Sequence, residues 1–321
     1  MRDMAYEEYP GRILLCEANQ WPDDVVEYFG DGDECQMAFH FPVMPRLYMG
    51  LRRSSRECIS QILADTPQIP EGCQWGTFLR NHDELTLEMV TEEERRARWA
   101  ELARESRWRC HLGIRRRWRP LVDTDDAKIR LLNAMLLSLP GSPVLYYGDE
   151  IGMGDDPWLP DRDGVRTPMQ WDDSETAGFS TALPEDFHLP VIHTFGHDPE
   201  HVNVARQMDD PSSLLVWTRA MLGIRRHHPV FGTGEFTDLG GADMAVMSFL
   251  RHNEHETILC LANLSDTERT VTLHLPQFAG VTGSSLIHGQ DAHPVKSDGT
   301  LSVPLWPYGY RWLQMSGEEK S

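Results

Sequence analysis

Acidic side chains and one histidine follow directly after short apolar runs at three places in the sequence. These residues are, in chain order, Glu17, His82 with Asp83, and Asp149 with Glu150. The carboxyl ends of parallel strands meet at one edge of a sheet, so groups placed there can share a site. A carboxylate at such a position is costly to bury unless it is paired or used. We therefore take Glu17 and Asp83 as candidates for acid–base chemistry.

Two carboxylates that face each other across a sugar can cleave a glycosidic bond. One protonates the leaving oxygen, and the other attacks the sugar or stabilises its charge. The acid must stay protonated near neutral pH, so its surroundings have to disfavour the anion. Glu17, which ends an apolar run, is a candidate for that acid. The alternative is that Glu17 and Asp83 form structural ion pairs with nearby arginines such as Arg80.

The elements that would position these residues alternate between strands and helices over the first two-thirds of the chain. Alternation of this kind favours parallel strands joined by helical crossovers, and four such units make about half of an eight-stranded (β/α) barrel. Strands are expected at 12–18, 36–41, 75–80 and 143–148, and helices at 43–63, 84–106, 126–139 and 212–228. The stretch 152–211 is rich in Asp, Pro and Gly and is expected to form an ordered excursion above the barrel.

The pattern changes after about residue 235. Short runs rich in β-forming residues follow one another, separated by turn residues, which indicates a small antiparallel β-sandwich. The predicted organisation is an α/β domain over residues 1–235 followed by an all-β domain over 236–321.

Composition excludes several classes of function. With 30 Lys and Arg against 50 Asp and Glu, the net charge is -20, so nucleic-acid binding is excluded while neutral sugars remain compatible. No apolar run is long enough to span a bilayer, and membrane association is not expected. The six cysteines form no C-x-x-C pair and the histidines no H-E-x-x-H, so no metal site is predicted. Scattered cysteines without a secretion signal fit the cytoplasm.

Five longer motifs together resemble glycoside hydrolase family 13. They are LLCEANQWPDDVVEYFG at 14–30, MAFHFPVMPRLYM at 37–49, FLRNHDELTLEMVT at 78–91, SLPGSPVLYYGDEIGMGD at 138–155 and DRDGVRTPMQWD at 161–172. The resemblance implies that the chain holds strands five to eight of the family's TIM barrel, followed by its C-terminal β-sandwich. Within the family, EANQWP and NHDELTLEMVT are similar to the members that convert maltose to trehalose, whereas oligo-1,6-glucosidases usually carry NHDQPR.

The resemblance also implies roles for individual residues. Glu17 aligns with the general acid/base and Asp83 with the aspartate that stabilises the transition state. Four residues are expected to bind the sugar: His82, Arg166, Asn19 and Glu84. For Glu84, a charge at a helix N-terminus is an equally good interpretation.

The sequence departs from the family pattern in one respect that matters for activity. The family's nucleophilic aspartate lies in a G-F-R-x-D-A segment, and this sequence has none. Strands one to four and the family's calcium site are also expected to lie outside this chain, so no cofactor is predicted. Chemistry on maltose or trehalose would then need the missing half in trans, and exposed barrel edges predict self-association. The alternatives are an α-glucosidase that hydrolyses its substrate and a non-catalytic partner subunit.

Overall fold

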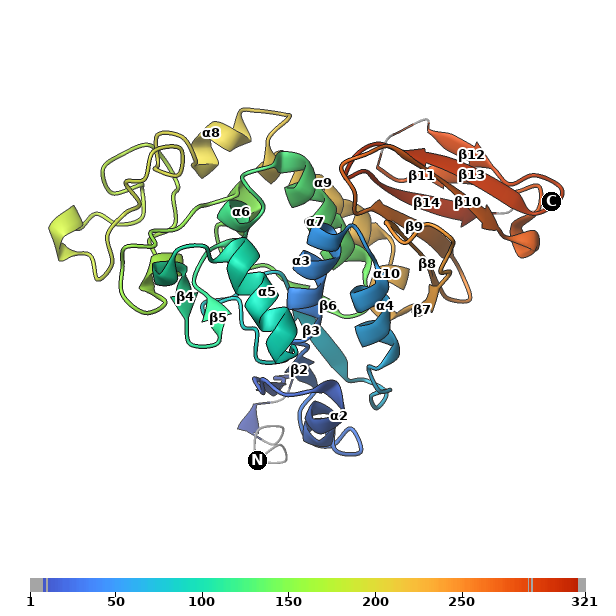
Figure 1. Cartoon of the computed structure of the whole chain (residues 1–321), viewed down its shortest axis with the longest axis horizontal. Coiled ribbons are helices and arrows are strands. Elements are labelled where there is room, and N and C mark those ends of the chain that lie inside the picture. The colour runs from blue at the N-terminus through green and yellow to red at the C-terminus, as the bar shows by residue number, and fades with distance from the viewer. Residues whose placement is uncertain (1–7, 10, 288, 290, 317–321) are drawn as a thin grey trace. The chain divides into compact units, whose positions relative to one another are not determined.

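The chain, seen here in a computed structural model, consists of two compact units (Figure 1). The structure describes residues 8–9, 11–287, 289 and 291–316. The first unit comprises residues 1–46, 62–129 and 141–219, and the second comprises 47–61, 130–140 and 220–321. Four helices contain residues of both units, namely α3 (Val43–Arg53), α4 (Glu57–Ala64), α7 (Asp126–Ser138) and α9 (Leu214–His227).

A four-stranded parallel sheet forms the centre of the first unit. Its strands lie side by side in chain order: β1 (Leu15–Cys16), β2 (Met37–Phe39), β3 (Gln74–Phe78) and β6 (Ser142–Val144). The prediction of four parallel strands is confirmed, although each strand is shorter than its apolar run. Beneath β2 and β3, Phe29 and Trp75 meet edge to face at 5.1 Å, which adds a favourable aromatic contact to the buried core.

The remaining elements of the first unit are short. They are α2 (Pro22–Val25), α5 (Glu92–Leu102), α6 (Trp118–Leu121), α8 (Val204–Met208) and a hairpin of β4 (Arg109–Cys110) with β5 (Gly113–Ile114). Three-residue 3-10 turns interrupt the chain, including η3 (Asp149–Ile151), η4 (Asp163–Val165) and η5 (Pro184–Asp186). Residues 152–211 are therefore largely irregular, as predicted. A buried cluster that includes Met153, Ile192 and Val202 nevertheless gives this stretch a core of its own.

Two predicted helices are shorter than expected. The helix predicted at 43–63 is split into α3 and α4, because Ser54 adopts a left-handed φ of 46° that a continuing helix cannot accommodate. The helix predicted at 84–106 begins only at Glu92. Thr91 caps its N-terminus, since its side chain accepts a hydrogen bond from Glu94 N at 3.2 Å while the Glu94 carboxylate accepts from Thr91 N at 2.9 Å.

The second unit contains an antiparallel β-sandwich, as predicted. One sheet has the order β12-β11-β14-β9-β8-β7, and β10 pairs with β13 in the other. The strands, drawn orange to red in Figure 1, are β7 (Glu235–Asp238), β8 (Val246–His252), β9 (Thr257–Asn263), β10 (Arg269–His274), β11 (Thr282–Ser285), β12 (Ala292–Pro294), β13 (Thr300–Leu305) and β14 (Tyr310–Ser316).

The two sheets of the sandwich share one apolar core. Leu259 and Leu313 of the larger sheet belong to the same buried cluster as Val271 and Val303 of the smaller one. Burial alternates along β10 and β13, which fits an outer sheet with one face in the core and one in water. The antiparallel sheet begins at Glu235, while the exact limit between the two predicted domains stays a prediction.

Candidate active site

Glu17, His82 and Asp83 converge at the carboxyl end of the parallel sheet. Glu17 follows β1 directly, and the other two lie in the loop after β3. One carboxylate oxygen of each acid and one ring nitrogen of His82 all lie within 4.8 Å of one another. The three groups are therefore close enough to face one bound sugar unit together.

The loop after β3 is held in place by its own polar groups. Arg80, which is buried, donates from Nη2 to the Asp83 carbonyl at 2.6 Å. The Asp83 N–H donates to Asn81 Oδ1 at 3.1 Å. These contacts fix the backbone at Asp83, so the carboxylate has a defined direction. Arg80 thus contacts the backbone of Asp83, and the side-chain ion pairs of Asp83 involve other arginines.

Two arginines from the segment around η4 hold the Asp83 carboxylate. Arg166 Nη2 lies 2.9 Å from Asp83 Oδ1, and Arg162 Nε lies 3.3 Å from the same oxygen. Arg166 also donates from Nε to the His82 carbonyl at 2.7 Å. A carboxylate oxygen shared by two guanidinium groups is a poor nucleophile, because its electron density is engaged in charge-assisted hydrogen bonds. Asp83 is therefore better suited to stabilise positive charge than to attack a sugar.

Two tyrosines that follow β6 anchor the segment that carries these arginines. The Tyr146 hydroxyl donates to the Val165 carbonyl at 3.1 Å, and the Tyr147 hydroxyl donates to the Thr167 carbonyl at 2.7 Å. Residues on either side of Arg166 are thereby tied to the end of the parallel sheet. The position of Arg166 over Asp83 follows from these bonds rather than from the ion pair alone.

Glu84 is buried beside an arginine, and sugar binding by Glu84 stays a prediction. It is 6% exposed, and its Oε2 lies 2.7 Å from Arg162 Nε. The hydrogen bond with Glu84 raises the pKa of Arg162 above its already high ordinary value, so the guanidinium stays charged. No helix begins at Glu84, since α5 starts eight residues later, and the helix-terminus interpretation is wrong. Glu84 positions Arg162 beneath Asp83.

Asn19 lies close to the site but contacts a different part of the loop. Its amide nitrogen donates to Thr86 Oγ1 at 3.3 Å and to the Glu88 carboxylate. These bonds link the segment after β1 to the segment after β3, which are the two segments that carry Glu17 and Asp83. The structure thus shows Asn19 joining the two segments that carry Glu17 and Asp83, and sugar binding by Asn19 stays a prediction.

Glu17 and His82 are open to solvent, in contrast to the sequence expectation for the acid. Glu17 is exposed even though it follows an apolar run, because β1 is the edge strand of the sheet. The side chain of His82 is 54% exposed, and its Nε2 lies 3.7 Å from Asp83 Oδ1. Both groups can therefore contact a sugar that enters from outside.

Asp149 and Glu150, the third pair of acidic residues, do not join this cluster. Asp149 is buried, and its Oδ1 lies 3.5 Å from Nη1 of the fully buried Arg117. Arg117 Nη1 also donates to the Tyr147 carbonyl at 2.7 Å, and its guanidinium carbon lies 4.8 Å from the ring centres of Tyr146 and Tyr147. Burial raises the pKa of Asp149 to about 7, although Arg117 acts in the opposite direction. Asp149 and Arg117 together support the tyrosines that anchor the segment carrying Arg162 and Arg166.

Sequence reasoning missed Arg162 and Arg117. The DRDG run at 161–164 forms a turn and the start of η4, but nothing in it signals that Arg162 bridges Asp83 and Glu84. Arg117 stands in a run of three arginines, a pattern that normally marks a solvated face. Only the three-dimensional contacts show that it is buried against two tyrosines that also contact each other.

Comparison with known proteins relates both parts of the chain to amylases. The family "Alpha amylase, catalytic domain" matches residues 115–234, and "Maltogenic Amylase, C-terminal domain" matches residues 239–312. The crystal structure of alpha-amylase from H. orenii is similar with a TM-score of 0.70 at 19% identity, over 98% of this chain and 55% of that one. The fold is therefore that of the α-amylase family, followed by an antiparallel β domain.

Curated relatives are much more similar in sequence. The trehalose synthase/amylase of Mycobacterium tuberculosis is 51% identical over 99% of this chain and 54% of its own length. The trehalose synthase of Pimelobacter sp. is also 51% identical, over 98% of this chain and 57% of its own length. The chain is thus a homologue of trehalose synthases and spans about half the length of the curated relatives it matches.

Proposed function

We propose, from the homology of this chain to trehalose synthases of the α-amylase family, that it carries the acid/base side of a site that converts maltose to trehalose. The observation that supports this most directly is the convergence of Glu17, His82 and Asp83 within 4.8 Å. A general acid, a hydrogen-bonding imidazole and an ion-paired carboxylate are the groups that cleavage of a glucoside requires on one face of the sugar.

The proposed reaction proceeds in two steps with Glu17 in both. Glu17 first gives its proton to the glycosidic oxygen of maltose, so the bond from that oxygen to C1 breaks as a nucleophilic carboxylate bonds to C1. The released glucose stays in the site and turns. Its anomeric hydroxyl then attacks C1 as the bond from C1 to the nucleophilic carboxylate breaks, and Glu17 takes up the hydroxyl proton. This step yields trehalose and restores the free nucleophile and the protonated Glu17. Asp83, held by Arg166, stabilises the positive charge on the ring in each step.

The nucleophilic carboxylate in this scheme is a third group. The cluster holds two carboxylates, and Asp83 Oδ1 is engaged by Arg162 and Arg166. We therefore propose that the equivalent of the part of the relatives that this chain does not match supplies the nucleophile. Exposure of Glu17 and His82 is consistent with a site that this part completes.

A hydrolytic α-glucosidase is the second candidate, and the same exposure favours it. Retention of glucose for the second step requires that water be kept from C1. The open surroundings of Glu17 would let water compete unless a partner covers them.

Product analysis separates the two functions. The chain would be produced together with the part of the Pimelobacter trehalose synthase that it does not match, and the pair would be supplied with maltose. Trehalose as the main product supports the isomerase, whereas glucose alone supports the glucosidase. Binding of maltose to the chain itself, followed by ligand-observed NMR, would be tested in parallel. Absence of binding by the folded chain would contradict both functions.

The compartment is proposed to be the cytoplasm. All six cysteines are free, which suits a reducing environment. Across the part of the chain that the structure describes, every helix is too short or too polar to cross a membrane.

A further inference from the structure

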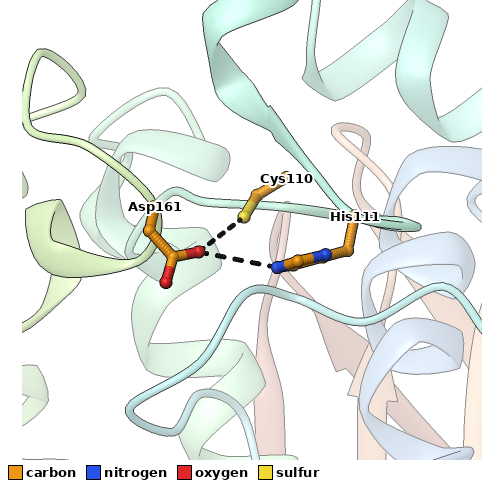
Figure 2. Close-up of side chains that lie close together, drawn as sticks. All are labelled: Cys110, His111 and Asp161. Carbon is orange, nitrogen blue, oxygen red and sulfur yellow. Dashed lines mark hydrogen bonds and ion pairs between the residues drawn. The ribbon is translucent and has the colours of Figure 1, made fainter.

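A second cluster of side chains lies at the hairpin of β4 and β5. Cys110 is the last residue of β4, His111 is the first residue of the turn that follows, and Asp161 reaches them from the loop that precedes η4. Figure 2 shows the thiol and the imidazole pointing at the same carboxylate oxygen. One ligand atom of each residue lies within 4.8 Å of the others.

The distances in this cluster match the spacing of ligands around a tetrahedral metal ion. Cys110 Sγ lies 3.5 Å from Asp161 Oδ1, and His111 Nε2 also lies 3.5 Å from Asp161 Oδ1. Zinc bonds of about 2.3 Å to sulfur, 2.0–2.1 Å to nitrogen and 2.0–2.2 Å to oxygen, at tetrahedral angles, would separate sulfur and oxygen by about 3.5 Å and nitrogen and oxygen by about 3.4 Å. The three side chains could hold such an ion with only small movements.

The two segments that supply the ligands are fixed to each other. Arg115, just after β5, donates from Nη1 to the carbonyls of Leu159 and Asp161, both at 3.0 Å. The hairpin is held in turn at Leu85, whose N–H donates to the Ile114 carbonyl at 2.8 Å. The ligands therefore belong to a scaffold that does not depend on a metal ion.

The Asp161 carboxylate has a cation near its far side. Oδ1 faces Cys110 and His111, while Oδ2 lies 4.0 Å from Nη1 of Arg162. His111 and Asp161 also have left-handed backbones, with φ of 49° and 44°, a conformation that is uncommon outside glycine and concentrates at functional positions.

We propose that Cys110, His111 and Asp161 form a binding site for a zinc ion, with water in the fourth position. A thiolate, an imidazole and one carboxylate suit zinc, whereas Ca²⁺ and Mg²⁺ prefer sites made of oxygen ligands. On binding, the Cys110 thiol gives up its proton to solvent and its sulfur bonds to the metal, with no change in oxidation state. The site is separate from the Glu17 cluster and does not depend on the proposed sugar chemistry.

Motif searches do not find this site, for a simple reason. Two of its ligands are adjacent in the chain and the third follows fifty residues later, so neither a C-x-x-C nor an H-E-x-x-H spacing occurs. The sequence analysis predicted no metal site, and the proposal departs from that prediction because only the fold brings these ligands together.

Cobalt titration of the full chain tests the proposal, because Co²⁺ substitutes for zinc and a thiolate ligand gives it a near-ultraviolet charge-transfer band. The wild type should develop this band and lose it when Zn²⁺ is added. Cys110→Ser should abolish the band, while His111→Ala and Asp161→Asn should each weaken cobalt binding at least about tenfold. Proton release on Zn²⁺ addition, measured in weak buffer, should be lost in Cys110→Ser.

Two matched variants serve as controls. Cys58→Ser removes another cysteine, and His201→Ala removes a histidine that pairs with Asp198 at 2.7 Å in a different loop. Both should bind cobalt like the wild type. Absence of a thiolate band in the wild type, or a band unchanged in Cys110→Ser, would overturn the proposal. It would also fail if only His82→Ala abolished binding, since the ion would then occupy the Glu17 cluster. If Cys110→Ser does not fold, the other two ligand variants decide the matter.

Discussion

Arg166 Nη2 lies 2.9 Å from Asp83 Oδ1, and Nε of the same guanidinium donates to the His82 carbonyl at 2.7 Å. One arginine therefore contacts both the Asp83 carboxylate and the His82 backbone carbonyl, and it fixes their positions together. Because two tyrosines anchor the segment on which Arg166 stands, this geometry is built into the fold around the end of the parallel sheet.

Replacement of Arg166 should affect sugar binding more than stability. The side chains of Arg166 and Asp83 are each about one-third exposed, and such ion pairs contribute about 0–1 kcal/mol. Arg166→Met should lower the free energy of unfolding by less than about 1 kcal/mol in a urea melt. The same variant should weaken maltose binding, since Asp83 loses its orientation. Equal maltose affinity in the variant and the wild type would contradict a role of Arg166 in the site.

Replacement of Glu84 should affect stability more than sugar binding. Glu84 is buried and forms an ion pair with Arg162. Glu84→Gln therefore removes the negative charge that compensates the partly buried Arg162 guanidinium. The expected loss of unfolding free energy is about 1–3 kcal/mol. Glu71→Gln, at an exposed turn residue, is the control and should change stability by less than about 0.5 kcal/mol. If the two variants melt alike, Glu84 does not position Arg162.

Asp149 should make the chain less stable as the pH rises. Its pKa is raised from about 4 to about 7 in the folded state, so the folded chain holds this proton more tightly than the unfolded chain. Its contribution to stability is complete below about pH 4 and is lost as the pH rises through about 7. Asp149→Asn keeps the side chain neutral at every pH, so the difference in unfolding free energy between this variant and the wild type should shift in favour of the variant as the pH rises through about 7.

Urea melts at several pH values would measure this difference. The exposed Asp186→Asn variant is the control and should follow the wild type at each pH. The difference in unfolding free energy between Asp149→Asn and the wild type should change with pH. If it stays constant from pH 4 to pH 8, Asp149 is not buried as a neutral acid.

The parallel strands and the outer sandwich could be predicted because their residues carry local signals. Apolar runs of β-forming residues mark β1, β2, β3 and β6, and alternation marks β10. Strand β13 contains Pro304, and proline is tolerated there since β13 pairs with β10 alone in the described part of its sheet. Ser54 ends α3 by a backbone conformation that the residue type does not announce.

The site was only partly accessible from the sequence. Glu17, His82 and Asp83 stand at strand ends, so their convergence follows from the parallel topology once that is known. The place of Glu84 could not be inferred, because its partner Arg162 comes from a segment 78 residues away. Contacts of that kind depend on how irregular loops fold back, and loops carry little periodic signal.

The chain alone should convert maltose at a negligible rate. Of the carboxylates in the cluster, Glu17 is needed as the acid, and Asp83 is held by two arginines. Without a nucleophile, the reaction is no longer divided into two easier steps, which lowers its rate by several orders of magnitude. Chromatographic analysis of maltose incubated with the purified chain should show no trehalose, and clear trehalose formation would mean that a residue of this chain acts as the nucleophile.

The most direct test of Glu17 as the acid/base is the kcat/KM for maltose of the chain combined with the unmatched part of the Pimelobacter relative. Glu17→Gln should lower this value by about 10²–10⁴-fold, the usual contribution of a general acid or base. Glu27→Gln, at an exposed glutamate of the 3-10 turn Val26–Phe29, is the matched control and should retain full activity. A Glu17→Gln value within a few-fold of the wild type would contradict the assignment of proton transfer to Glu17.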